Sequence, residues 1–269
     1  MKISVIIPSY KPGDYIWDCL NSLILQTLSK SDFEVIIVLN GCNEPWKSEI
    51  ESFISLNMSD MNVKFIQTDV GGVSNARNIA LDEAIGDFVT FIDDDDFVSS
   101  LYLESMINMT KQDVDVVVLS NTVAFDDLSK EIFEYQLSDV YKKFLNKTNL
   151  QISSSVRKYF SGPCMKLLPM SCIQGRRYDV RFRNGEDSLF MFLISDKIKS
   201  IVFANENAIY YRRYRESSAI TTKGLLINRL VNSSKLIKEY FIIAFKYRVN
   251  FLFFITRILG TVKSIFITY

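Results

Sequence analysis

The first 92 residues alternate short apolar runs with amphipathic segments, and this order restricts the possible folds more than any other feature of the chain. Apolar runs rich in β-branched residues lie at positions 3–7, 33–39, 63–67 and 88–92. Apolar residues at helical spacing separate them, over residues 14–28, 44–56 and 75–85. Buried strands that alternate with helices are typical of a parallel sheet covered by helices on both faces. The sequence therefore predicts an α/β fold with a doubly wound, mostly parallel sheet.

Polar or glycine-rich loops follow each of these apolar runs. They cover residues 8–13, 40–43, 71–78 and 93–96. In open α/β sheets, ligands bind outside the carboxyl ends of the strands, near the point where the strand order reverses. Because all of these loops occur at such ends, we expect them to lie together on one rim and to form the ligand site.

The loop at residues 93–96 consists of four consecutive aspartates. Their carboxylates repel one another at close range, so a cation would stabilise the group. Carboxylate oxygens suit Mg²⁺ or Mn²⁺, and such ions are often held by one or two carboxylates together with phosphates of a substrate. A solvated acidic loop after a strand is the alternative interpretation of this run.

Two features of the composition restrict the chemistry and the compartment. The chain contains no histidine, which excludes every mechanism that needs an imidazole and leaves carboxylates as the candidate bases. Its four cysteines form no CxxC pair, which indicates reduced thiols. A strand is expected at once after the first residue, so we expect no signal peptide and a cytoplasmic location.

The sequence resembles the family 2 glycosyltransferases, which have the GT-A fold, a Rossmann-like, mostly parallel sheet flanked by helices. The resemblance covers about the first 220 residues, through four motifs in the family's order. These are Ser4-Val-Ile-Ile-Pro8-Ser9-Tyr10, Gly71-Gly-Val-Ser-Asn-Ala-Arg77-Asn78, Asp93-Asp94-Asp95-Asp96 and Gly185-Glu186-Asp187. A bacterial enzyme of surface polysaccharide synthesis, such as lipopolysaccharide synthesis, is the setting that this resemblance implies.

The resemblance also implies roles on the donor side. The turn with Pro8, Ser9 and Tyr10 and the end of the second strand, at Asn40, would hold the nucleotide base. The family usually has an aspartate at the latter position, and an asparagine cannot form an ion pair there. Arg77 would lie near the nucleotide; a buried arginine that pairs with the aspartates is the alternative. In the family's DxD motif, Asp93 would approach the ribose and Asp95 would bind the metal, with Asp94 beside them and Asp96 either lining the acceptor side or capping a helix.

On the acceptor side, Glu186 and Asp187 resemble the acidic pair whose aspartate is the general base. A helix N-cap fits Asp187 as well, but the absence of histidine favours the base. Lys166 and the group Arg212, Arg213 and Arg215 are candidates to neutralise the diphosphate leaving group. A solvated edge is the alternative for all of them, and above all for Arg213 and Arg215.

Residues 223–269 form a predicted helical extension that follows a catalytic domain of residues 1–222, whose donor half ends near residue 100 and whose acceptor half follows. From residue 225 the chain has seven Lys and Arg residues against Glu239 alone, a net charge of +6. No uncharged run reaches the length of a bilayer span. Lys246, Asn250, Arg257 and Ser264 share one helical face, which predicts a helix lying on the inner face of the plasma membrane. Packing on its own domain or on a partner subunit, as in a homo-oligomer, is the alternative.

The leading interpretation is an inverting, metal-dependent transferase that moves a sugar from a nucleoside diphosphate donor, expected to be a UDP-sugar. The acceptor would be a glycan or a lipid-linked molecule, and no nucleic-acid partner is expected. A nucleotidyltransferase is one alternative, although the loop at residues 8–13 lacks the glycine-rich, basic character expected there. A catalytically inactive module that binds glycan or lipid is the other.

Overall fold

The computed structural model describes residues 2–111, 113–152, 155–214 and 226–266. Its central sheet has seven strands in the order β10-β6-β9-β4-β1-β2-β3. β9 runs antiparallel to both of its neighbours, whereas the other pairings are parallel, so the sheet is mostly parallel as predicted. The strands are β1 (Ile3–Ser9), β2 (Phe33–Asn40), β3 (Asn62–Thr68), β4 (Phe88–Phe91), β6 (Val116–Leu119), β9 (Lys166–Pro169) and β10 (Ser200–Phe203).

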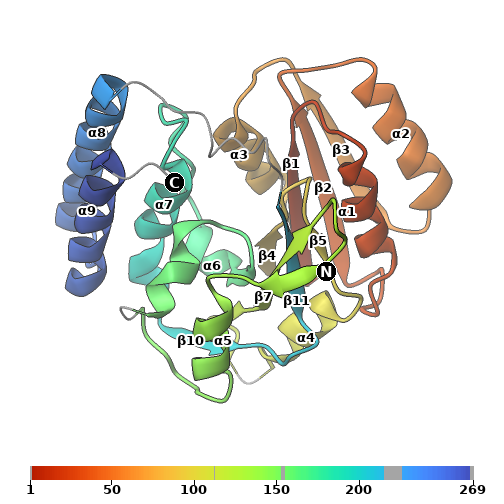
Figure 1. Cartoon of the computed structure of the whole chain (residues 1–269). Coiled ribbons are helices and arrows are strands. Elements are labelled where there is room, and N and C mark those ends of the chain that lie inside the picture. Colours follow the sequence, from red (N-terminus) through yellow and green to blue (C-terminus); the bar gives the residue numbers. More distant parts are fainter. Residues whose placement is uncertain (1, 112, 153–154, 215–225, 267–269) are drawn as a thin grey trace.

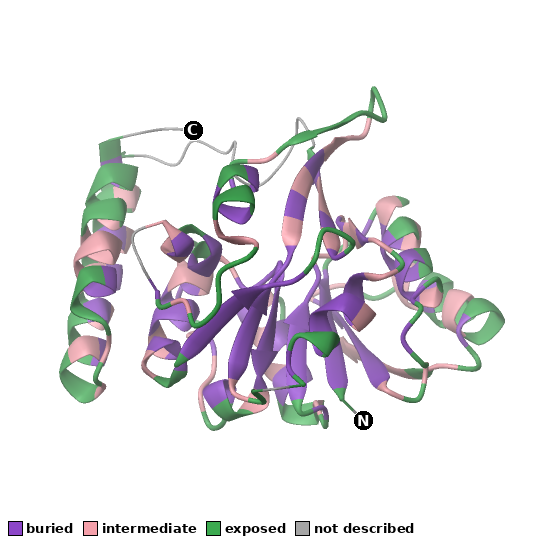
Figure 2. Cartoon of the chain, turned by 90° about the horizontal axis from the view of Figure 1, so that it is seen from below, coloured by how far each residue is buried: buried purple, intermediate pink, exposed green. Residues whose placement is uncertain are grey.

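Helices cover both faces of this sheet. α1 and α2 lie on one side of the first strands and α3 lies on the other (Figure 1). In α1 the buried residues Ile16, Cys19, Leu20 and Leu23 recur every three or four positions, which is why this segment forms a helix with one face in the core. Figure 2 shows the buried residues concentrated in the sheet and on the inner faces of the helices. The helices of this part are α1 (Tyr15–Ile24), α2 (Trp46–Asn57), α3 (Val73–Glu83), α4 (Tyr102–Asn108), α6 (Met170–Ile173) and α7 (Glu186–Leu193).

The strand order reverses beside β1. The chain runs outward from β1 to β2 and β3, and then returns to place β4 on the other side of β1. The loops after β1 and β4 therefore leave the sheet next to each other, where ligands bind in such folds. A hydrogen bond of 2.6 Å from Ser9 Oγ to Asp94 Oδ2 joins the two loops.

A second sheet covers the acidic turn. It has four strands in the order β5-β11-β7-β8, namely β5 (Phe97–Val98), β11 (Ile209–Tyr214), β7 (Asn121–Asp126) and β8 (Ile132–Glu134). β5 begins directly after Asp96 and pairs with β11, which fixes the end of the turn. Residues 121–158, for which no element was predicted, contribute β7, β8, α5 (Ser138–Phe144) and the start of a short 3-10 helix, η1 (Val156–Ser161).

The C-terminal extension is helical, as predicted, but it forms two helices in place of one continuous amphipathic face. α8 (Leu226–Lys246) and α9 (Phe251–Phe266) lie side by side and flank α7 (Figure 1). The chain turns at residues 247–250, so Lys246 and Asn250 do not continue the face that carries Arg257. Arg257 instead donates to the main-chain oxygen of Phe160. The predicted boundary at residues 222 and 223 lies outside the described residues.

Neither α8 nor α9, nor any other described helix, combines the length and the apolar character that a membrane span needs.

Candidate functional site

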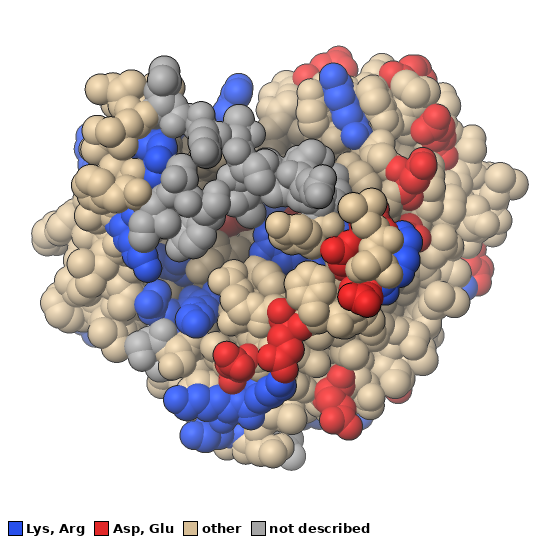
Figure 3. All heavy atoms as spheres, viewed as in Figure 1, with Lys and Arg blue, Asp and Glu red and all other residues tan. Residues whose placement is uncertain are grey.

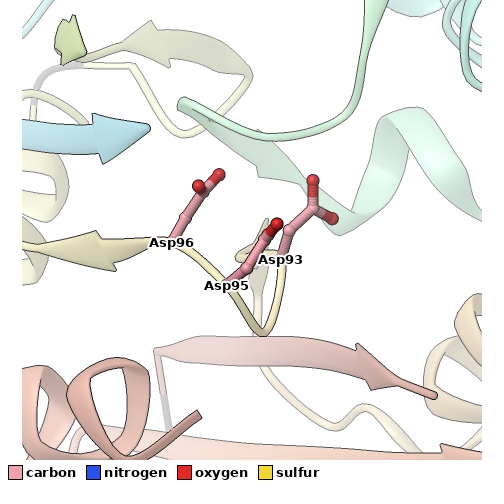
Figure 4. Close-up of side chains that lie close together, drawn as sticks. All are labelled: Asp93, Asp95 and Asp96. Atoms are coloured by element: carbon pink, nitrogen blue, oxygen red, sulfur yellow. The ribbon is translucent and has the colours of Figure 1, made fainter. Parts of the chain in front are cut away.

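The acidic turn places three carboxylates together. Asp93, Asp95 and Asp96 each offer an oxygen atom, and these atoms lie within 4.8 Å of one another. Figure 4 shows the three side chains extending from the loop after β4 toward the same space. Such a set of hard oxygen ligands without nitrogen or sulfur fits Mg²⁺ or Mn²⁺. When bound, the ion would neutralise negative charge on a diphosphate leaving group.

Asp96 is the most buried of these acids. Its carboxylate accepts hydrogen bonds from Tyr210 Oη at 2.7 Å and from the Arg213 amide at 2.8 Å. Burial, followed by the charges of Asp95 and Asp93, raises the pKa of Asp96 well above its usual range. A cation among the three acids would offset this repulsion, so the carboxylates that are present fit a metal. Asp96 lines the cavity described below and precedes a strand, so it is no helix cap.

Arg77 joins the acidic turn to the start of α7. Its side chain is 3% exposed, and its guanidinium donates to Asp187 through Nη1 and to Asp93 through Nη2, the latter at 3.0 Å. In this structure Arg77 is thus a buried arginine that pairs with two aspartates, which was the alternative to a contact with the nucleotide. Because one cation holds both acids, Asp93 and Asp187 face the same space from different parts of the chain.

The start of α7 presents Asp187 to the site, and glycine is required there. Gly185 has φ of +85°, and a Cβ atom at this residue would lie 2.5 Å from Leu236 of α8. Asp187 lies in the first turn of α7, whose N-cap is Gly185, and its carboxylate accepts a hydrogen bond from Arg77. Asp187 is therefore not the N-cap of this helix. Burial raises the pKa of Asp187, and Arg77 opposes this effect. Glu186 is 9% exposed, and burial followed by the charge of Asp187 raises its pKa to about 7.

A cavity of about 300 Å³ connects the two groups of acids. Asp93 and Asp96 line one side of it, and Asp187 lines another. The remaining wall comes from the segment after β8, from η1 and the residues that follow it, and from β11. It contains Tyr135, Gln136, Leu137, Lys158, Tyr159, Ser161, Gly162, Pro163, Cys164, Met165 and Arg212.

The residues predicted to hold the base fall into two groups. Tyr10 is 55% exposed on the rim, where an aromatic ring can stack on a base, whereas Pro8 and Ser9 are buried in β1. Asn40 is 3% exposed; its Nδ2 donates to the Ser9 oxygen at 2.6 Å, and its Oδ1 accepts from the Gly72 amide at 2.8 Å. Asn40 therefore positions the neighbouring loops, which differs from the predicted contact with a base.

The close packing of those loops also requires glycine. Gly41, directly after Asn40, has φ of +64°, and a Cβ atom there would lie 2.7 Å from Gly71 Cα. The two loops at the ends of β2 and β3 therefore touch through their main chains.

The predicted diphosphate contact of Lys166 is wrong. Lys166 is fully buried, and its Nζ donates to the main-chain oxygens of Gly162 and Cys164, both at 2.6 Å. Burial lowers its pKa to about 7. Lys166 therefore holds the segment that forms the cavity wall, and does not enter the cavity.

The predicted arginines after residue 211 also differ from one another. Arg212 is half-buried, lines the cavity and donates to Tyr135 Oη, so it remains a candidate for the diphosphate. Arg213 is buried against Asp18 and Asp127, which makes its role structural and not that of a solvated edge. Arg215 lies outside the described residues.

Sequence reasoning missed the wall formed by residues 158–165 and 135–137. These residues carry no family motif, and they approach the acids only through the antiparallel strand β9 and the second sheet. The turn signal at Ser161-Gly162-Pro163 was the sole local indication of this wall.

The overall arrangement is that of the GT-A fold. The structure of residues 1–349 of TarS from Staphylococcus aureus in complex with UDP-GlcNAc matches 89% of this chain and 66% of that chain, with a TM-score of 0.72 and 23% identity. The mannosyltransferase PcManGT from Pyrobaculum calidifontis, in complex with GDP-Man and Mn²⁺, matches 98% of this chain and 69% of that chain, with a TM-score of 0.64 and 14% identity.

Two curated relatives differ in how much of their own length the match covers. The poly(ribitol-phosphate) β-N-acetylglucosaminyltransferase TarS from Staphylococcus aureus (strain Mu50) is 27% identical over 225 residues, which cover 82% of this chain but 37% of TarS. The glycosyltransferase GlyG from Streptococcus pneumoniae serotype 4 is 26% identical over 234 residues, which cover 82% of this chain and 73% of GlyG. The chain thus spans well under half of the length of TarS. Residues 4–170 match the family model described as Glycosyl transferase family 2, and the chain therefore belongs to that family.

Proposed function

We propose that this protein is an inverting, metal-dependent glycosyltransferase that uses a UDP-sugar donor. The observation that carries the proposal is the placement of Asp93, Asp96 and Asp187 around one cavity, with Arg77 bonded to two of them. Inverting transfer needs a base on the acceptor hydroxyl, across the reacting carbon from the leaving nucleotide. Asp187 suits this role because its raised pKa makes it a stronger base than an ordinary carboxylate.

The donor half supplies the remaining groups. Tyr10 would contact the base, Asp93 the ribose, and Asp95 the metal, while Arg212 would neutralise charge on the diphosphate. A UDP-sugar is favoured because the TarS structure that resembles this chain contains UDP-GlcNAc. Family membership favours glycosyl over nucleotidyl transfer. Synthesis of a bacterial surface polymer is the setting, in line with a relative from Bacillus subtilis, the minor teichoic acid biosynthesis protein GgaB.

Metal dependence tests the donor half. Asp95→Ala is expected to lower Mn²⁺-dependent release of UDP from UDP-GlcNAc by about 10²-fold or more, because charge on the leaving diphosphate is then less well neutralised. Chelation of the metal should have the same effect on the unsubstituted protein. Initial rates of UDP release, with Mn²⁺ and with Mg²⁺, give the measurement.

Asp32→Ala is the matched control, since Asp32 forms a surface ion pair with Lys2 away from the cavity. It should release UDP at the unsubstituted rate. Equal rates in Asp95→Ala and Asp32→Ala would refute the metal site. Absence of binding or hydrolysis with any nucleotide sugar would favour the inactive binding module.

α8 and α9 form a helical hairpin, and its exposed residues support peripheral attachment of the protein at the cytoplasmic membrane surface. Phe245 and Phe251 are 89% and 75% exposed, and Leu252 and Leu259 are 52% and 62% exposed. Exposed lysines and arginines accompany them, including Lys246, Arg248 and Lys263. Apolar residues that insert and cations that attract anionic lipid form the pattern of an interfacial helix. A lipid-linked acceptor would make such contact useful.

Vesicle sedimentation tests this attachment. The protein is expected to bind vesicles that contain phosphatidylglycerol, and Phe245→Asp with Phe251→Asp should lower the bound fraction several-fold, because two inserted rings are replaced by charges. The pair Leu56→Asp and Leu128→Asp, exposed apolar residues outside the hairpin, is the control. If the control pair lowers vesicle binding as much as the hairpin pair, the hairpin is not the membrane surface.

A further inference from the structure

Three cationic side chains surround the cavity wall opposite the acidic turn. η1 carries Arg157 and Lys158, and α9 carries Arg257. Arg257 donates through Nη2 to the Phe160 oxygen and lies 3.4 Å from Ser161 Oγ through Nη1. Lys158 and Ser161 both line the cavity. The three cations therefore gather around one short segment of the wall, residues 157–162.

No described carboxylate pairs with these cations. The Nε atoms of Arg157 and Arg257 are buried and have no hydrogen-bond partner among the described residues. The pKa of Arg257 is lowered to about 10, mainly by burial; Tyr240 opposes this effect and the nearby charge of Arg157 adds to it. The ring of Phe253 lies 4.6 Å from the Arg257 guanidinium, but an aromatic ring carries no net charge. The cluster is thus a group of like charges that repel one another.

The two fully buried arginines of the site differ in this respect. Arg77 holds Asp93 and Asp187, and Arg213 holds Asp18 and Asp127. Burial of a cation is costly unless an anion and hydrogen bonds compensate it. Arg157 and Arg257 are half-buried, with buried Nε atoms, but no acid among the described residues pairs with either of them. An anion from outside the chain would complete this cluster.

The position of the cluster indicates which molecule would bring that anion. Lys158 and Ser161 line the cavity, and the next residue of this wall, Gly162, lies close to the proposed base, because a Cβ atom on Gly162 would be 4.0 Å from Asp187 Oδ2. The segment that carries the cations is therefore adjacent to Asp187. Figure 3 shows lysines and arginines gathered beside the hollow on the side of α8 and α9, where few acidic side chains are visible, whereas on its other sides acidic side chains are mixed with further lysines and arginines. An anion bound there would belong to the acceptor.

We propose that Arg157, Lys158 and Arg257 form a subsite for a phosphate group of the acceptor, adjacent to the hydroxyl that receives the sugar. This inference rests on the proposed transferase function and names its acceptor class, a phosphodiester or phosphomonoester. Guanidinium groups match phosphate oxygens in geometry and charge, and Lys158 adds a mobile cation at the exposed edge. The phosphate can come from a polyol-phosphate polymer or from a lipid headgroup, which have the same recognised chemistry.

Binding of defined probes to the whole chain tests the subsite. Calorimetric titration compares a synthetic ribitol-phosphate oligomer with an uncharged dextran oligosaccharide, and vesicle sedimentation compares phosphatidylglycerol with phosphatidylcholine. Arg157→Gln and Lys158→Gln are each expected to weaken binding of the oligomer about tenfold and to reduce its dependence on salt. Lys199→Gln, a surface lysine paired with Asp115, is the control and should bind as the unsubstituted protein does.

The outcomes distinguish a polymer phosphate from a lipid phosphate, and they test the anion subsite separately from the transferase function. Binding of the oligomer that is lost in both variants identifies a polymer phosphate, and vesicle binding that is lost in both, without oligomer binding, identifies a lipid phosphate. If neither probe binds, or if both variants bind like Lys199→Gln, the subsite is refuted. UDP-GlcNAc binding, measured in the same samples, tests the donor site separately. Its absence beside intact phosphodiester binding contradicts the transferase function and leaves the anion subsite standing.

Discussion

Replacing Asp187 with Asn is expected to lower kcat for sugar transfer by about 10²- to 10⁴-fold, the range typical for loss of a general base. The amide keeps the size of the side chain and can still accept a hydrogen bond from Arg77, but it cannot take the proton of the acceptor hydroxyl. The affinity for UDP-GlcNAc should change little, since the proposed role of Asp187 is on the acceptor and not on the donor. Initial rates of UDP release in the presence of Mn²⁺ and an acceptor, together with calorimetric donor binding, measure both quantities.

Asp82→Asn is the matched control for this substitution. Asp82 also pairs with an arginine, Arg177, but its side chain is 62% exposed and remote from the cavity. The control is expected to retain the rate of the unsubstituted protein. If Asp187→Asn transfers sugar at a rate within a few-fold of Asp82→Asn, Asp187 is not the base, and a different carboxylate of the cavity must be sought.

The donor half was predictable because its signals are local. β1, β2 and β4 are buried, mainly apolar runs, β3 is a half-buried strand, and each is followed by a loop whose polar residues lie at the carboxyl end. That order alone implies a parallel sheet and a rim of loops. The structure places Asp93 and Asp187 at one cavity, although the residues lie far apart in the sequence.

The acceptor half was not predictable to the same degree, because its contacts are made across the fold. β9 lies between β4 and β6 and runs antiparallel to both. The spacing of apolar residues in the sequence does not predict such an insertion. Lys166 illustrates the consequence. Its chemistry suggested a phosphate contact, but its position on a fully buried strand turns its ammonium toward main-chain oxygens of the preceding segment.

The contacts of the C-terminal extension were also not predictable from the sequence. Helical spacing correctly indicated helices, but the turn at residues 247–250 changes which residues share a face. Arg257, expected on an outer polar face, bonds to the cavity wall. α8 meanwhile contacts the start of α7, where Tyr240 Oη lies 2.8 Å from Ser188 Oγ. The extension is therefore part of the support of the site as well as a candidate membrane surface.

Replacing Arg77 with Met is expected to lower the free energy of unfolding by about 3–5 kcal/mol near pH 8, the range typical when one partner of a buried ion pair is removed. Asp93 and Asp187 would then face each other without a cation. Chemical denaturation measures the loss. Arg181→Met is the matched control, because Arg181 also holds two acids, Asp179 and Glu239, but is 65% exposed. Its loss should cost about 1 kcal/mol or less.

The pH dependence of the Arg77→Met protein distinguishes electrostatics from packing. The charge of Arg77 opposes the effect of burial on the pKa of Asp187, so its removal raises that pKa further. A raised folded-state pKa means that the folded protein binds more protons than the unfolded chain, and the destabilisation must therefore shrink as the pH falls and Asp187 becomes protonated. The acidic limb of the activity profile should move to higher pH for the same reason. A loss of stability that is equal at pH 5 and pH 8, with an unmoved acidic limb, would show that Arg77 contributes volume to the core and not charge to the site.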